Sequence, residues 1–190
     1  MQGRLTSFQK TMLQWNDLHP YNAVHVVRLR AALDLPRLQA ALHRTFEPRE
    51  LAGVRLDRNA GHIHFDGSPA DFEVRILAPA PDPAAALVAE IERQLNAPFA
   101  AGGRLIPFRF FIVAEPDQFA LGLVYFHPIG DAHSVVGLLK ELTETYLAQP
   151  MPAPGRPLEL YPRPGDRELF GRPGWLRRAR DSVEDGRRGR

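Results

Sequence analysis

Residues 106–126 read IPFRFFIVAEPDQFALGLVYF and contain two strongly apolar segments, 106–114 and 119–126. Each segment has the length of a strand and includes aromatic and β-branched residues, which favour strands. The four residues between them, EPDQ at 115–118, have the composition of a turn. The stretch therefore predicts an antiparallel pair of mostly buried strands.

The segments on either side of this pair carry both strand and helix patterns. Residues 23–29 alternate between apolar and polar side chains, as strands do, and Asp34 followed by Pro36 marks the start of a helix with one apolar face. Further elements are predicted as helices at 4–15, 84–96 and 134–148, a hairpin of 54–57 with 62–65, and a strand at 72–77.

The order of these elements indicates the fold class. Because hairpins interrupt the alternation of strands and helices, we predict an α+β fold with a mixed, largely antiparallel sheet and helices packed mainly on one face. We expect this domain to span residues 1–149. Six prolines crowd residues 150–164, so residues 150–190 are interpreted as a proline-rich linker and a basic tail, with a short helix at 170–183.

The composition excludes several kinds of site. The chain has 190 residues and no cysteine, which rules out disulfides, thiolate catalysis and cysteine-based zinc sites. No apolar run approaches the length of a membrane-spanning helix, and the first residues lack the apolar core of a signal peptide. We therefore expect a cytoplasmic chain with no membrane span.

The positive charge is concentrated in the tail, where residues 163–190 hold nine arginines and five acidic residues. A basic tail fits a nucleic acid, an acidic partner or a solvated segment. Because no nucleic-acid-binding motif accompanies these arginines, we expect no nucleic-acid binding.

His127 lies at the junction between the second apolar segment and the loop before the last predicted helix. Strand ends of this kind commonly carry sites, and histidine is suited to act as a general base for an alcohol or an amine. The same pattern also fits a structural role, in which His127 bonds to the backbone and Asp131 caps the helix. The pattern by itself leaves both interpretations open.

Residues 126–132, FHPIGDA, resemble the HHxxxDG motif of nonribosomal peptide synthetase condensation domains and related coenzyme-A-dependent, chloramphenicol acetyltransferase-like acyltransferases. YNAVHVVRLR at 21–30 is similar to the first strand of that family. NAPF at 96–99 and PFRF at 107–110 are similar to its Pro-Phe segment and its arginine-bearing strand. The resemblance covers residues 4–148 and concerns only the N-terminal lobe of a two-lobed enzyme.

The resemblance implies the fold and the activity of an acyltransferase. It places His127 at the catalytic centre and gives Asp131 a structural role through an ion pair with an arginine, for which the candidates are Arg28, Arg30 and Arg109. The donor would be acyl-coenzyme A or a phosphopantetheine-linked thioester, bound as substrate without a tightly bound cofactor, and the acceptor an alcohol or an amine. The implied partners are a carrier protein and either a second lobe or further copies of the chain.

Two residues depart from the family motif: Phe126 stands in place of its first histidine and Ala132 in place of its glycine. The stabiliser of the oxyanion is not evident, and helix N-terminal amides near Ser134 are one candidate. Two other functions stay open, a non-catalytic interaction module and an inactive fragment of a two-lobed enzyme.

The remaining histidines give weaker signals. His133 would border the site at the start of the last helix. His62 and His64 lie two residues apart on one face of a predicted strand, a spacing that suits a metal ion. No third ligand is evident, so we expect surface or structural roles for the pair and no metal site.

Overall fold

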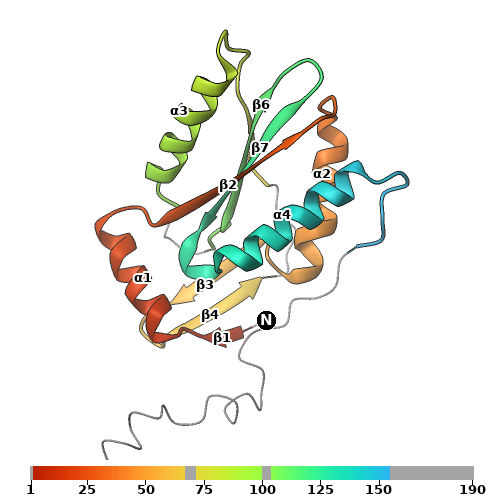
Figure 1. Ribbon diagram of the computed structural model, residues 1–190. Coiled ribbons are helices and arrows are strands. Elements are labelled where there is room, and N and C mark those ends of the chain that lie inside the picture. Colours follow the sequence, from red (N-terminus) through yellow and green to blue (C-terminus); the bar gives the residue numbers. More distant parts are fainter. Residues whose placement is uncertain (1, 67–71, 100–103, 155–190) are drawn as a thin grey trace, which may run out of the picture. The chain divides into compact units, whose positions relative to one another are not determined.

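The computed structural model describes residues 2–66, 72–99 and 104–154 of the chain, which form two sheets and four α-helices (Figure 1). The larger sheet has the strand order β2 (Asn22–Leu29), β7 (Phe119–Phe126), β6 (Phe108–Ala114) and β5 (Val74–Ile76). The smaller sheet has the order β1 (Gln2–Arg4), β4 (His62–Asp66) and β3 (Gly53–Asp57). The helices are α1 (Ser7–Leu18), α2 (Leu35–Phe46), α3 (Pro83–Asn96) and α4 (Ala132–Leu147), with 3-10 turns η1 (Glu47–Arg49) and η2 (His127–Ile129).

The two apolar segments form the central strands of the larger sheet, as predicted. Strand β7 is buried along its whole length and pairs antiparallel with both β6 and β2. Strand β5 pairs with β6 in parallel. The predicted α+β class and the mixed, largely antiparallel sheet are therefore confirmed.

Helices cover both faces of the larger sheet (Figure 1). Helices α2 and α4 share one face, where Phe46 of α2 meets Phe108 edge-on with ring centroids 4.9 Å apart. Helix α3 covers the other face, where the Asn22 amide donates to the Ala97 carbonyl at 2.7 Å. The expected placement of the helices on one face thus holds for α2 and α4, and α3 lies on the opposite face. Both faces of β7 are apolar, so each face must be covered by a helix.

The predicted helix starts are confirmed by their caps. Asp34 accepts a hydrogen bond from the Arg37 amide at 3.0 Å, and Asp82 accepts from the amides of Ala84 and Ala85. Each cap satisfies backbone donors that have no partner within the helix. The hairpin of β3 and β4 is also confirmed, and its turn contains Gly61 at φ +68, a left-handed conformation that favours glycine.

The N-terminal segment differs from its prediction. The helix begins at Ser7 rather than residue 4, and residues 2–4 form strand β1, which pairs with β4. Phe8 and Trp15, which have the spacing of one helix face, are 63% and 44% exposed. The 3.6-residue period was visible in the sequence, but it does not say whether another element covers that face.

Of the predicted linker and basic tail, only residues 150–154 belong to the described part of the chain, and the predicted helix at 170–183 lies outside it. The domain boundary at residue 149 therefore stays a prediction. None of the helices within the described ranges is long and apolar enough to cross a membrane.

Gly122, in the middle of β7, provides a test of core packing. A Cβ atom at this position would lie 2.1 Å from the Phe111 ring on β6, so Gly122→Ala forces the ring or the strands to move. We expect the substitution to lower the free energy of unfolding by about 1–3 kcal/mol, the usual effect of overpacking, as measured by urea denaturation.

Gly137 in α4 is the matched control, because a Cβ there meets nothing within 4 Å. Gly137→Ala should raise the free energy of unfolding by about 0.5–1 kcal/mol through helix propensity. Equal effects of the two substitutions would contradict the packing described for Gly122.

Candidate functional site

His127 is positioned by the end of the central strand. It follows β7 directly and is the first residue of η2. Its backbone amide donates to the Tyr21 carbonyl at 3.2 Å, which extends the pairing of β2 and β7 by one residue. The loop is also tied to α1, because the Gln9 side-chain amide donates to the Pro128 carbonyl at 3.0 Å. Two elements distant in sequence thus fix the backbone at His127.

The imidazole of His127 contacts the rings of two tyrosines. The Tyr21 ring stacks on it, with ring centroids 5.2 Å apart and planes 12° apart. The Tyr125 ring meets it at 62°, with centroids 5.5 Å apart. Trp15 in turn meets Tyr21 edge-on at 5.4 Å. These ring contacts favour the orientation that the imidazole adopts.

Among the described residues, the His127 ring has one polar contact, between Nδ1 and the Gly130 carbonyl at 3.3 Å. A carbonyl oxygen only accepts, so this contact is a hydrogen bond when the proton is on Nδ1. Nε2 then carries the lone pair that a general base needs. The structural interpretation predicted a bond from His127 to the backbone, and Nδ1 can form that bond while Nε2 acts as a base. The two interpretations of His127 are therefore compatible.

Asp131 caps helix α4, as the structural interpretation predicted. Its carboxylate accepts hydrogen bonds from the Ser134 amide at 2.9 Å and from the Ser134 hydroxyl at 2.8 Å. The bond from the Ser134 amide is the main reason why the pKa of Asp131 lies below its usual value. The carboxylate also orients the first turn of the helix that follows His127.

The expected arginine partner of Asp131 is not found among residues 2–66, 72–99 and 104–154. Arg28 lies 3.9 Å from Glu115, and Arg109 donates to the Ala97 carbonyl at 2.9 Å at the end of α3. Arg30, the third candidate, forms no ion pair with Asp131 either. The candidates identified from sequence were therefore wrong, and within this part of the chain Ser134 takes the place of the arginine.

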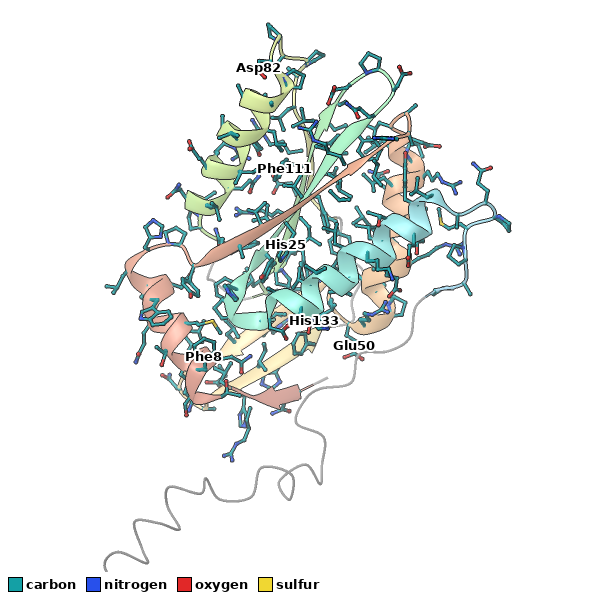
Figure 2. All side chains as sticks on the ribbon, in the orientation of Figure 1. Phe8, His25, Glu50, Asp82, Phe111 and His133 are labelled. Carbon is teal, nitrogen blue, oxygen red and sulfur yellow. The ribbon has the colours of Figure 1, made fainter. Side chains whose placement is uncertain are left out.

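The Ser134 amide is occupied by Asp131 and cannot also stabilise an oxyanion. The Val135 amide donates to the Asp131 carbonyl. Neither the Ser134 amide nor the Val135 amide is therefore available as an oxyanion donor. His133 lies exposed at the start of α4, beside the same loop (Figure 2).

His62 and His64 lie away from this site, on β4 of the smaller sheet, with ring centroids 6.3 Å apart. Across the described ranges, no group of three or more histidine, aspartate or glutamate side chains is arranged to hold a metal ion. Sequence reasoning singled out neither Tyr21 nor Tyr125 as a site residue. The available signal was the position of Tyr125 two residues before His127, which places both on one strand face.

Comparison with protein-family models gave no match, and comparison with curated proteins gave none either. The starter condensation domain of the rhizomide synthetase RzmA, in a variant form, is similar in structure with a TM-score of 0.66 and 18% identity over 80% of this chain. The first condensation domain of the calcium-dependent antibiotic synthetase, in complex with a substrate analogue, has a TM-score of 0.66 and 17% identity over 82%. The fold is that of a condensation-domain N-terminal lobe.

The chain spans only 39% and 40% of the length of these two relatives. A further structure of the RzmA starter domain, in complex with C8-CoA and Leu-SNAC, has a TM-score of 0.64 and 19% identity over 82% of this chain. The chain therefore has the fold of condensation domains over less than half the length of such a domain.

The Asp131 cap predicts a defined dependence of stability on pH. Because the pKa of Asp131 is lowered in the folded state, its contribution to stability is present above the ordinary value of 3.8 and is lost as pH falls through the folded value. Asp131→Asn keeps the acceptor oxygen and should remove this acid-dependent part, whereas Asp131→Ala should cost about 1 kcal/mol at neutral pH. Urea denaturation across this pH range measures both effects, and an unchanged acid dependence in Asp131→Asn would contradict the assignment.

Proposed function

We propose that the chain is one half of an acyltransferase that moves an acyl group from a thioester to an alcohol or amine, with His127 at the active centre. The observation that carries the proposal is that Nε2 of His127 has no hydrogen-bond partner among the described residues, at a strand end of a condensation-domain fold. Asp131 supports the same loop without taking part in the chemistry.

The proposed reaction needs a single base. Nε2 of His127 accepts the proton of the acceptor O–H or N–H as its heteroatom bonds to the thioester carbonyl carbon. The tetrahedral intermediate then collapses with cleavage of the C–S bond, and the imidazolium returns the proton to the leaving thiolate. The products are an ester or amide and a free thiol.

We propose that a second half completes the site, supplied by another polypeptide segment or by a further copy of this chain. Strand β2 ends the larger sheet, so one side of its backbone has no strand partner among the described residues. Phe8, Trp15 and Leu18 expose 63%, 44% and 87% of their surfaces on α1, next to η2. Apolar surface of this kind beside a site supports an interface with a partner.

The proposed donor is acyl-coenzyme A or an acyl group on the phosphopantetheine of a carrier protein. Structures of the RzmA domain, a protein of similar fold, contain C8-CoA alone or together with Leu-SNAC. The presence of C8-CoA there supports an acyl-coenzyme A donor for this chain. The donor enters as substrate, and the proposed chemistry requires no tightly bound cofactor.

A non-catalytic interaction module is the second candidate. The open edge of β2 and the exposed apolar residues of α1 favour it, because these features suit a partner whether or not chemistry follows. The two candidates differ in whether His127 is needed.

The deciding experiment is a thiol-release assay with acetyl-coenzyme A and a panel of alcohols and amines. The chain has no cysteine, so a thiol reagent reads the product without background from the protein. The chain is assayed alone and after co-expression with the product of the neighbouring reading frame. We expect acceptor-dependent thiol release that falls by about 10²–10⁴-fold in His127→Ala.

His133→Ala is the matched control, because His133 lies in the next turn and is exposed. It should retain the wild-type rate. Equal rates in His127→Ala and the wild type would exclude the role of His127, and partner binding without thiol release would favour the interaction module.

A further inference from the structure

The Tyr125 side chain is held rigidly beside His127. The residue is 1% exposed, and its ring stacks on His25 of β2 with centroids 5.6 Å apart and planes 11° apart. Its other neighbour is the His127 ring, 5.5 Å away. Figure 2 labels His25 on β2 and His133 at the start of α4, the two elements that border this corner.

The hydroxyl of Tyr125 forms no hydrogen bond with any part of the described chain. Buried tyrosines normally find a partner for this group. Tyr146 shows the usual arrangement, because its hydroxyl accepts from the Asp34 amide at 2.9 Å and donates to the Ala32 carbonyl at 3.0 Å. An unpaired hydroxyl on a rigid, buried ring therefore calls for a ligand.

Two other unpaired polar atoms on strand β2 are fully enclosed. The unpaired polar side-chain atoms that are fully enclosed within the described residues include His25 Nε2 and Asn22 Oδ1 but not the Tyr125 oxygen. The Tyr125 residue as a whole is only 1% exposed. Any ligand that contacts Tyr125 does so through this oxygen.

The charge distribution keeps this hydroxyl a donor. Burial, and to a lesser extent the negative charge of Asp131, raise the pKa of Tyr125 above its usual value. The phenol therefore stays protonated at neutral pH. The contact between the Tyr125 and His127 rings places Tyr125 in the corner where η2 leads into α4.

A donor at this position fills a gap in the site. Acyl transfer places negative charge on the carbonyl oxygen of the tetrahedral intermediate, and the Ser134 amide is already bound to Asp131. We propose that the Tyr125 hydroxyl donates a hydrogen bond to the thioester carbonyl oxygen at the His127 centre, which makes Tyr125 a second catalytic residue. This inference rests on the proposed acyl transfer.

The role requires no net proton transfer from Tyr125. The hydroxyl donates to the carbonyl oxygen of the bound thioester and keeps its proton while His127 accepts the proton of the nucleophile. The hydrogen bond strengthens as that oxygen becomes an oxyanion and weakens again when the C–S bond breaks. Tyr125 thus binds the substrate oxygen, and His127 moves the proton.

The test compares the binding of two ligands that differ in a single non-hydrogen atom, the carbonyl oxygen. Acetyl-coenzyme A has the carbonyl oxygen, and S-ethyl-coenzyme A lacks it. Calorimetric titration of the 190-residue chain should show about three- to tenfold tighter binding of the acetyl ligand, the effect of one hydrogen bond. In Tyr125→Phe the two ligands should bind equally.

The matched control is Tyr146→Phe, which removes a hydroxyl that is bonded within the protein. It should lower the thermal midpoint and keep the ligand preference. Tyr125→Phe should leave the midpoint unchanged, because its hydroxyl contributes no hydrogen bond to the fold. An unchanged thermal midpoint shows that Tyr125→Phe is folded, so that a lost ligand preference cannot be due to unfolding.

The outcomes separate this inference from the proposed function. A preference for the acetyl ligand that persists in Tyr125→Phe overturns the role of Tyr125 and leaves acyl transfer intact. Wild-type binding without any preference overturns it as well. Failure of the wild type to bind either ligand overturns the proposed donor and the role of Tyr125 together.

Discussion

The antiparallel register of β7 between β2 and β6 is the constraint on which the site depends. Tyr125 lies opposite Ala23 on one side and opposite Phe108 on the other. Its side chain therefore faces His25, whereas the next residue, Phe126, faces the opposite side and meets Phe99. A slip of one residue would exchange these two faces and turn the phenol away from His127. Apolar packing on both faces of β7 holds the register in place.

The arginine of the central strands serves the fold rather than the site. The Arg109 guanidinium lies 4.0 Å from the centre of the Phe99 ring, and both it and the Asn22 amide donate to the Ala97 carbonyl. Carbonyl groups at the end of a helix attract cations, so Arg109 fastens the end of α3 to the sheet. This use explains why Arg109 is not the partner of Asp131, whose carboxylate is instead saturated by its own helix.

Much of the fold could be predicted from sequence because its signals are local. The caps at Asp34 and Asp82, the glycine-containing hairpin turn and the apolar strand pair each depend on neighbouring residues, and each is found in the structure. Strand β1 was missed because three residues carry no periodic pattern and pair only with a distant hairpin. The exposure of Phe8 could not be predicted, because a helical period does not identify whether another element covers that face.

For the site, the sequence by itself determined that a histidine follows a buried strand and that Asp131 begins the next helix, since both are properties of adjacent residues. It also determined, by resemblance, the family of folds in which such a histidine occurs. Only the tertiary structure decided that Tyr21 stacks on His127 and, within the described part of the chain, that the Tyr125 hydroxyl has no hydrogen-bond partner and that Ser134 rather than an arginine binds Asp131. The reason is physical: strand pairing and ring contacts join residues about a hundred positions apart, and no local pattern fixes which of them meet.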